Sequence, residues 1–490
     1  MAMSIATFVM AAASGLQAVL YLSKFGTNAR TDGFFVAFAV YTTFGVFSQT
    51  LRVTTVPLLV GARARLTVRQ FAAALGLLAL PVIVATGPLA HPVSHVLAPG
   101  LGHGGRSVTA AALPVLGIAM ALQLWAAGAA TVLAVRDRFA AVAAAYIGGA
   151  VAGLVTFLGL MNRTGVQTLG WSMMAMALVT CAMMLVSVGT SGGLGAERRS
   201  LRPRALLAAA GLVLGGTPIY LAFNMLFVIS LAFASHGATG DSTVLSYAYL
   251  FASYLVAGTG TALGMSRIPE LSRRAHSEGT VLVRETVPQG FRYAVLLAAP
   301  AMAGLITAGA PLIHALLPGS LDKAEVHTLR VFAALLAPWM VVALIVSFVI
   351  PVLLATGRSS FLNKLAVPVV LIHLAATAIG SALFGVYGAV GAITVAPAFL
   401  AVALFLGGGQ RDSRKVSRTL ARHTGSFAGL AVAAFGVAWL LSSPISSQGA
   451  AAILAAMIGV VAYLAGLRVV ARQEVAVVMA AVANRRGGSQ

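Results

Sequence analysis

The sequence predicts an all-α polytopic membrane protein with about 14 transmembrane helices, arranged as two six-helix lobes related by a parallel pseudo-two-fold axis plus two C-terminal helices. Three observations predict this class. Hydrophobic residues make up 59% of the 490 residues, and the mean hydropathy of +0.96 lies above the range of soluble domains. Apolar runs of roughly 18 or more residues recur along the chain, each long enough to cross a hydrocarbon core as a helix. Only 9% of the residues are charged, and most lie between these runs.

Fourteen apolar runs bounded by Gly, Pro and charged residues form the predicted spans. The first run lacks the charged start and the cleavage site of a secretory signal, so we expect it to be retained as a span. In chain order the predicted spans are 3–22, 33–60, 71–90, 108–135, 139–160, 166–189, 205–234, 243–267, 290–317, 328–356, 361–384, 387–407, 425–442 and 449–470.

The basic residues predict how these spans are oriented. With the N-terminus in the cytoplasm, the inner segments hold 25 of the 32 Lys and Arg residues. This excess predicts cytoplasmic N- and C-termini, and a chain rich in Ala, Gly and Arg favours a bacterial cytoplasmic (inner) membrane. Because the charge of +21 is spread over seven short segments, it predicts contacts with membrane lipids and argues against nucleic acid as a partner. The outer segments hold only Lys24, Arg30, Arg106, Arg163, Lys323 and Arg330.

An internal repeat predicts the two lobes. Residues 25–41 (FGTNARTDGFFVAFAVY) resemble residues 236–253 (HGATGDSTVLSYAYLFAS), and a proline follows at a similar distance in each copy. Equivalent segments begin on the same side of the membrane, so the repeat is parallel, as in transporters whose lobes rock around a central cavity. Chance similarity between apolar segments is the alternative. The predicted division is a lobe at 1–189, a cytoplasmic linker at 190–204, a lobe at 205–407, a basic cytoplasmic loop at 408–424, two further helices at 425–470 and a cytoplasmic tail at 471–490.

The sequence has none of the motifs that carry enzyme chemistry: no serine-nucleophile elbow, zincin motif, nucleotide loop or pair of acids. We therefore expect no enzymatic activity and no cofactor. His91, His95 and His103 share one outer loop, but no carboxylate joins them and prolines interrupt the helix, so we expect no metal site. Cys181 is the single cysteine, which excludes an intramolecular disulfide.

Three segments carry a resemblance to a known family. FGTNARTDGFFVAF (25–38) resembles the Phe-Gly…Thr-Asp-Ala-Phe-Phe-Val-Ala-Phe signature of the MurJ/MviN lipid II flippases, members of the MOP (multidrug/oligosaccharidyl-lipid/polysaccharide) exporter superfamily. GTALGMSRIPELSRRA (260–275) resembles the exit of that family's eighth span, and LATGRSSFLNKLAVPVV (354–370) its loop between spans 10 and 11. The resemblance implies fourteen spans, a central cavity that opens alternately to each side, and a groove at the last two spans for a polyprenyl tail.

The chain departs from that family in the residues that would give the cavity its charge. Span 1 of the lipid II flippases carries arginines, where this chain has Gln17. In span 8, Tyr249, Leu250 and Ser253 stand where the resemblance implies charged residues. The resemblance therefore predicts that this chain keeps the family's scaffold but lacks most of the cationic side chains of its cavity.

The candidate charged residues lie at the mouth of the predicted bundle or within span 2. Arg52 is the single charge deep within a span, so it either contacts the phosphate of a lipid-linked substrate or extends to the inner headgroups. Asp32 and Asp241 precede helices in the two copies of the repeat, where each carboxylate can cap the helix it precedes. The alternative for this pair is a gate, or an ion pair with Lys24 or Arg30.

Neutral polar and aromatic residues within the spans are the other cavity candidates. Gln17, Gln49, Asn224 and Ser253 either line the cavity or form hydrogen bonds between helices. Tyr249, together with Tyr247 and Tyr254, would give an aromatic cavity of low charge.

Three functions follow from these residues and the resemblance. The first is an alternating-access flippase that moves an undecaprenyl-type lipid-linked cell-envelope precursor, such as a lipid II-like or other lipid-linked saccharide, from the inner to the outer leaflet. The second is a MATE-like exporter of an amphiphilic small molecule, for which an aromatic cavity is better suited. The third is a non-transporting membrane scaffold for envelope enzymes. The sequence gives no protein partner.

Overall fold

The computed structural model describes residues 2–59, 66–191, 202–256, 280–316, 321–407, 413–445 and 447–470, and regular secondary structure in these ranges is helical throughout. The first half of the chain forms α1 (Ala2–Phe25), α2 (Ala29–Leu59), α3 (Val68–Thr86), the short α4 (Ala90–Leu97), α5 (His103–Val135), α6 (Phe139–Leu160), the 3-10 turn η1 (Gly165–Gln167) and α7 (Thr168–Thr190).

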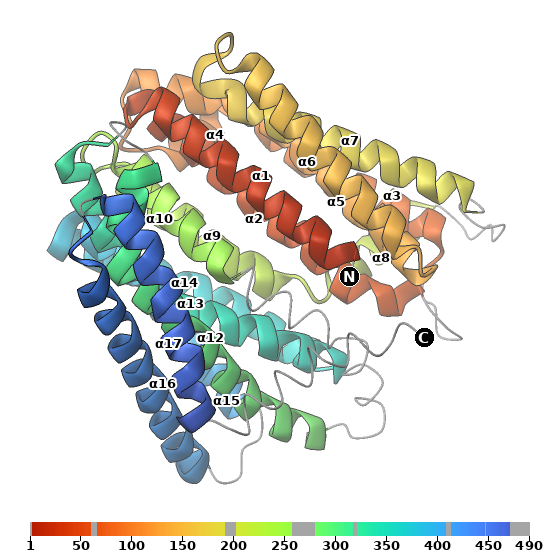
Figure 1. Cartoon of the computed structure of the whole chain (residues 1–490). Coiled ribbons are helices and arrows are strands. Elements are labelled where there is room, and N and C mark those ends of the chain that lie inside the picture. Colours follow the sequence, from red (N-terminus) through yellow and green to blue (C-terminus); the bar gives the residue numbers. More distant parts are fainter. Residues whose placement is uncertain are drawn as a thin grey trace.

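The second half forms α8 (Pro203–Leu214), α9 (Pro218–Ala234), α10 (Asp241–Val256), α12 (Thr280–Leu316), α13 (Lys323–Ala355), α14 (Ser359–Gly391), the 3-10 turn η3 (Ala392–Thr394), α15 (Val395–Gly407), α16 (Ser413–Ser442) and α17 (Gln448–Val470). In Figure 1 the helices α1–α7 form one group and α9–α15 another. The last two helices, α16 and α17, pack against α12 on the outside of the second group.

The predicted membrane class is confirmed. Each of the fourteen predicted spans overlaps at least one helix. In the described ranges, nine segments are long and apolar enough to cross a membrane, or ten if one bent pair of helices is a single span. The count of fourteen and the bounds of the two lobes stay predictions.

The predicted span 205–234 is broken in the structure. Helices α8 and α9 meet at an angle of 68° across the short connection 215–217. Glycines at this point interrupt the helix, and a proline begins the next one at a position where its missing N–H is not needed. The bend lets α8 pack against α3 in the first half while α9 packs against α14 in the second.

The predicted spans 361–384 and 387–407 are separated by a sharp kink inside α14. Gly385 has φ 58° and ψ −141°, a conformation that favours glycine. The backbones on the two sides of the kink then approach closely, because a Cβ on Gly388 would lie 1.9 Å from the carbonyl oxygen of Gly380. These glycines allow the chain to reverse direction.

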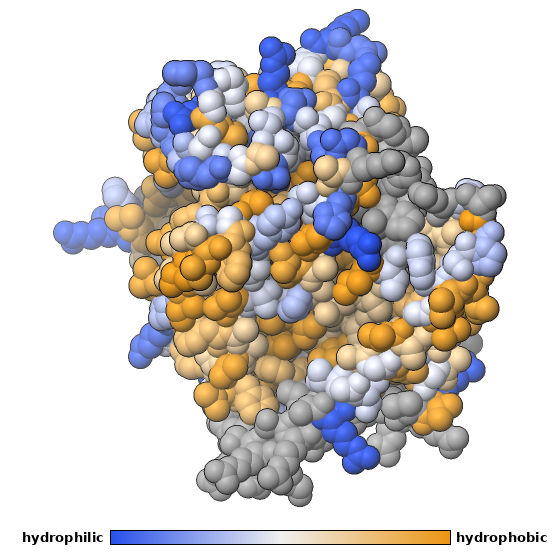
Figure 2. All heavy atoms as spheres, turned by 90° about the vertical axis from the view of Figure 1, so that its left-hand side faces the viewer, coloured by the Kyte–Doolittle hydropathy of each residue, from blue (hydrophilic) through white to orange (hydrophobic). Residues whose placement is uncertain are grey.

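The surface carries many exposed large apolar side chains. Examples are Phe384, Leu440 and Val461, each about two-thirds exposed. Figure 2 shows hydrophobic residues over much of one side of the molecule, with hydrophilic residues gathered mainly toward its upper part. In a soluble protein such surfaces would associate, whereas in a membrane they contact lipid.

Candidate functional site

A cavity of about 420 Å³ lies between the two halves of the chain. Its wall is formed by α1, α2, α5, α6 and α7 from the first half and by α9, α10 and α13 from the second. None of the described side chains that line it carries a formal charge. The described part of the lining is therefore neutral, apolar over most of the wall and polar at a limited number of positions.

Four aromatic rings from the second half form one side of the cavity, and we call this group the aromatic wall. Its members are Phe223, Phe227, Tyr249 and Trp339. The rings of Phe227 and Tyr249 stack with centroids 3.9 Å apart and planes 5° apart. The ring centroid of Trp339 lies 4.9 Å from that of Tyr249 and 6.3 Å from that of Phe223. The stacked rings fix one another, so the wall is a preformed surface.

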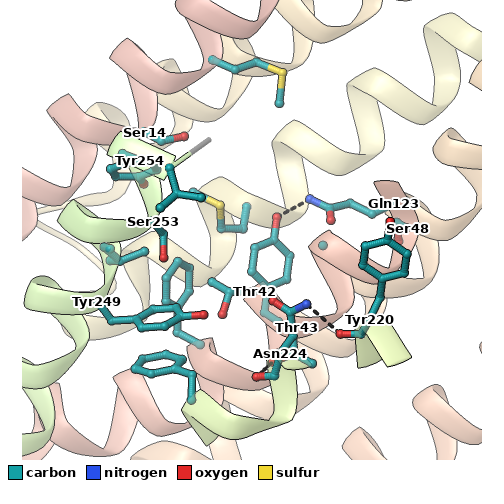
Figure 3. Close-up of a pocket in the computed structure, with 18 of the residues that line it drawn as sticks. Ser14, Thr42, Thr43, Ser48, Gln123, Tyr220, Asn224, Tyr249, Ser253 and Tyr254 are labelled. Carbon is teal, nitrogen blue, oxygen red and sulfur yellow. Dashed lines mark hydrogen bonds between the residues drawn. The ribbon is translucent and has the colours of Figure 1, made fainter. Parts of the chain in front are cut away.

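Polar side chains from the first half form a second group, which we call the polar wall: Tyr41, Thr42, Ser48 and Gln123. The Gln123 amide donates to the Tyr41 hydroxyl, which links α5 to α2. Ser48 is only 4% exposed, and within the described ranges its hydroxyl has no hydrogen-bond partner. Figure 3 shows Ser48 and Gln123 on the opposite side of the view from Tyr249. A buried hydroxyl without a partner is unusual and needs an explanation.

Asn224 lies between these two groups. Its side-chain amide donates to the backbone carbonyl of Tyr220 at 2.8 Å. The backbone carbonyl of Asn224 accepts from the Thr43 hydroxyl at 3.3 Å. The second contact joins α9 to α2 and so connects the two halves beside the cavity.

The two halves also meet at one end of the helices, where the α1–α2 turn (26–28) lies beside the α9–α10 turn (235–240). We call this the closed end. Asp32, which is 1% exposed in the first turn of α2, accepts hydrogen bonds from Gly240 N–H at 2.7 Å and from Thr243 N–H at 2.8 Å. The Thr243 hydroxyl also donates to this carboxylate, at 2.7 Å, and lies 3.2 Å from the Thr31 hydroxyl. The carboxylate therefore caps α10, a helix of the other half.

Further contacts join the halves at the closed end. The Thr27 hydroxyl donates to Glu325, which also takes part in the capping box at the start of α13 with Asp322. Gly100 N–H donates to the Ser235 hydroxyl at 3.1 Å. The Thr27–Glu325 and Gly100–Ser235 contacts each join a residue before 110 to a residue after 230, so they hold the two halves together.

Burial affects the acids at the closed end, which lie outside the predicted spans. It raises the pKa of the Asp32, Asp241 and Glu325 carboxyls above their ordinary values. Hydrogen bonds to Asp32 lower its pKa and oppose part of this effect. Keeping a charge at Asp32 thus has a cost that its three hydrogen bonds offset only in part.

Comparison with known proteins identifies the family. The family model described as "Lipid II flippase MurJ" matches residues 22–460. The chain belongs to the MurJ family. Among solved structures, one described as "Lipid II flippase MurJ, inward closed conformation" is similar at a TM-score of 0.72 and 15% identity, over 96% of this chain and 99% of that one. No curated protein matches the sequence.

Transporters of the MOP superfamily share the fold. A mutant of the Vibrio cholerae MATE transporter VcmN is similar at a TM-score of 0.59 and 12% identity, over 85% of this chain and 95% of that one. The MATE multidrug transporter DinF-BH is similar at a TM-score of 0.59 and 14% identity, over 82% of this chain and 94% of that one. At these identities the likeness shows the fold alone.

Within this MurJ-family fold, the structure brings three of the predicted cavity residues together. Asn224, Tyr249 and Ser253 line the cavity, as does Tyr254. Gln17 is buried on α1 and is not among the lining residues, although its neighbour Ala18 is. The side chains of the other two candidates, Arg52 and Gln49, lie outside the described part of the structure.

Two predictions about individual residues are wrong. Asp32 does not cap the helix it begins: Asn28 caps α2, accepting from Arg30 N–H at 2.9 Å and Thr31 N–H at 3.1 Å. Tyr247 is not among the lining residues: its side chain packs between the halves, and its hydroxyl donates to the carbonyl of Ala18 at 2.9 Å. Both side chains instead join the halves.

The other mouth residues do not pair. The Asp241 carboxylate accepts from Ala238 N–H at 2.7 Å, within the turn that precedes its own helix. Lys24 and Arg30 are exposed, and among the described residues neither forms an ion pair with Asp32 or Asp241. A gating role for these residues stays a prediction.

Several site residues were not predicted from the sequence. Gln123 lies within the predicted span 108–135, and Ser48 within 33–60, so each carried the same signal as Asn224: a neutral polar residue in an apolar run. His373 was not predicted either. It is a fully buried residue in α14 whose Nε2 lies 2.8 Å from the carbonyl of Leu226 and 3.0 Å from the Ser230 hydroxyl, so it joins α14 to α9.

Proposed function

We propose that this chain moves an undecaprenyl-type lipid-linked saccharide precursor from the inner to the outer leaflet of a bacterial cytoplasmic membrane by alternating access. Membership of the lipid II flippase family supports a lipid-linked substrate. The observation that carries the mechanism is the closed end: the halves meet there through Asp32 and its neighbours, while the cavity lies between the same helices further along the bundle.

In this proposal residues 1–189 and 205–407 are the two moving lobes. The closed end faces outward and both termini face the cytoplasm, because 25 of the 32 basic residues then lie on the inner side. Breaking the contacts of the closed end would open the cavity outward. The substrate crosses the membrane without chemical change, so transport and not catalysis is the activity.

A reversible crosslink across the closed end tests this mechanism. The hydroxyls of Thr31 and Thr243 lie 3.2 Å apart on different halves, so Thr31→Cys with Thr243→Cys places two thiols within reach of a disulfide. Cys181→Ala removes the native thiol. We expect oxidation to stop the movement of an undecaprenyl-diphosphate saccharide in proteoliposomes, measured by capture with a lectin that cannot cross the membrane, and reduction to restore it.

The chain offers a matched control pair within one half. The hydroxyls of Thr164 and Thr168 lie 2.8 Å apart, so the corresponding cysteine pair can also be oxidised without joining the lobes. Oxidation of this pair should leave transport unchanged. Continued flipping by the fully crosslinked Thr31/Thr243 pair would contradict alternating access.

Export of an amphiphilic small molecule is the second candidate, favoured by the uncharged aromatic lining of the cavity. The same proteoliposomes distinguish the two functions. Efflux of a neutral amphiphile without lipid movement supports export, whereas lipid movement that is blocked by the crosslink supports the flippase. If neither the amphiphile nor the lipid is transported, the result supports a non-transporting scaffold.

A further inference from the structure

We infer that the cavity holds an uncharged saccharide unit of the substrate, stacked on the aromatic wall and hydrogen-bonded by the polar wall, while the phosphate groups lie outside this chamber. The inference rests on the proposed function, which supplies a substrate with sugar and phosphate parts. It assigns a specific recognition role to the second-half rings and the first-half polar side chains.

The aromatic wall fits the apolar face of a sugar ring. Trp339 is 3% exposed and Tyr249 is 8% exposed, and both line the cavity. The faces of such rings are electron-rich and attract the weakly positive C–H groups that a pyranose presents on one side. Because Phe227 and Phe223 stack behind or beside them, the two rings keep their positions without the sugar.

The polar wall fits the hydroxyl groups at the rim of the same sugar. Hydroxyl and amide side chains both donate and accept, as sugar hydroxyls do, so they can match without any charge. The buried Ser48 hydroxyl has no hydrogen-bond partner among the residues that the structure describes. A ligand hydroxyl in the cavity would supply this missing partner.

The dimensions and charge of the cavity argue against a bound diphosphate. A volume of about 420 Å³ is within the usual range for small-molecule sites and has room for only part of a lipid-linked headgroup. A phosphate anion needs cationic or dense N–H partners when it leaves water. No described lining side chain is charged, so a neutral unit is the better fit.

Trp339 provides a direct test, because the chain has only four tryptophans. Replacing Trp125, Trp171 and Trp439 with Phe leaves Trp339 as the only fluorescent indole. This protein, in lipid nanodiscs free of glycoside detergent, is titrated with three short-chain probes: a polyprenyl diphosphate disaccharide, a neutral polyprenyl disaccharide without phosphate, and a polyprenyl diphosphate without sugar. We expect both sugar-bearing probes to change Trp339 emission with affinities within about threefold of each other, and the sugar-free diphosphate to leave it unchanged.

Substitution of Tyr249 sharpens the test. Tyr249→Leu removes one ring of the wall and should weaken both sugar-bearing probes about tenfold, whereas Tyr249→Phe keeps the ring and should retain most of the affinity. Phe384→Leu is the matched control, since that aromatic residue is 69% exposed on the lipid-facing surface. The elution profile of each variant confirms that it is folded.

The outcomes separate this inference from the proposed function. If the sugar-free diphosphate or a plain polyprenyl alcohol changes Trp339 emission as strongly as the sugar-bearing probes, saccharide recognition is overturned. If lipid is flipped while the sugar-bearing probes leave Trp339 silent, the inference fails and the flippase function stands. If the sugars bind as expected but no lipid is moved, the inference stands and the proposed function fails.

Discussion

Replacing Asp32 with asparagine should shift the protein toward a state in which the closed end is open. The carboxylate accepts three hydrogen bonds at 2.7, 2.8 and 2.7 Å, from Gly240 N–H, Thr243 N–H and the Thr243 hydroxyl. Asparagine has one acceptor oxygen in place of two. If this oxygen keeps the bonds to Thr243, the amide nitrogen faces Gly240 N–H, and two donors then oppose each other.

The size of the effect follows from these contacts. One buried donor left without a partner costs about 1–3 kcal/mol. Loss of the negative charge at the start of α10 adds about 0.3–1 kcal/mol. Relief from burying a carboxylate, whose pKa is already raised by burial, offsets part of this. A net change of about 2 kcal/mol corresponds to about a 30-fold shift, so an open state present at about 1% would rise to about 20–25%.

The distance between the halves can be measured directly. Spin labels on cysteines at Arg163 and His327, both exposed and on opposite halves, report separation in a Cys181→Ala background by pulsed electron resonance. Asp137→Asn is the matched control, because it makes the same chemical change at an exposed carboxylate beyond the far end of α5. If Asp32→Asn leaves the distance distribution equal to that of the control, the carboxylate does not hold the halves together and the reasoning is refuted.

Two further substitutions test the packing of the helices. Gly33→Ala should destabilise the protein by about 1–3 kcal/mol, because the new Cβ would lie 2.1 Å from the carbonyl oxygen of Gly105. Gly15→Ala is the control, since no atom lies near a Cβ at that position, and it should be neutral or slightly stabilising. Thermal unfolding in detergent measures both, and equal midpoints would contradict the close approach of α2 to α5. His373→Leu should cost about 1–3 kcal/mol in the same assay, because it removes the imidazole contacts with the Ser230 hydroxyl and the Leu226 carbonyl and leaves the Ser230 hydroxyl only its longer contact, 3.4 Å, with the Ala389 carbonyl. His327→Leu, at an exposed histidine, is its control. If His373→Leu lowers the thermal stability no more than this control does, His373 does not join the helices.

The sequence was sufficient to predict that the protein is helical, that it crosses a membrane, and that polar residues within its spans mark a cavity. Asn224 and Ser253 were found in this way. Gln17 carried the same signal and yet lies beside the cavity, because apolar spans are hydrophobic on every side and periodicity does not tell which face meets the substrate.

The contacts between the halves were beyond a single sequence. Asp32 and Gly240 are 208 residues apart, and the local rule that an aspartate caps the helix it begins assigned the carboxylate to the wrong helix. Trp339 lies in a long apolar span where an aromatic residue is ordinarily part of the core, so its place in the aromatic wall depends on how α13 packs against α9 and α10.

The two aspartates of the predicted repeat contribute unequally to closure. In a symmetric contact, Asp32 would cap α10 while Asp241 capped α2. The structure contains only the first of these: Asn28 caps α2 from its own turn, and Asp241 accepts from Ala238 N–H. Of the two repeat aspartates, only Asp32 therefore forms hydrogen bonds between the halves, while the Glu325 carboxylate of the second half accepts from Thr27.

This asymmetry predicts different results for the same chemical change. In Asp241→Asn the side-chain oxygen can still accept from Ala238 N–H, and no contact between the halves is lost, so the distance between labels at Arg163 and His327 should match that of the parent protein. Asp32→Asn should lengthen it. Equal opening in the two variants would show that closure depends on the total negative charge of the turns and not on the hydrogen bonds that Asp32 accepts from the other half.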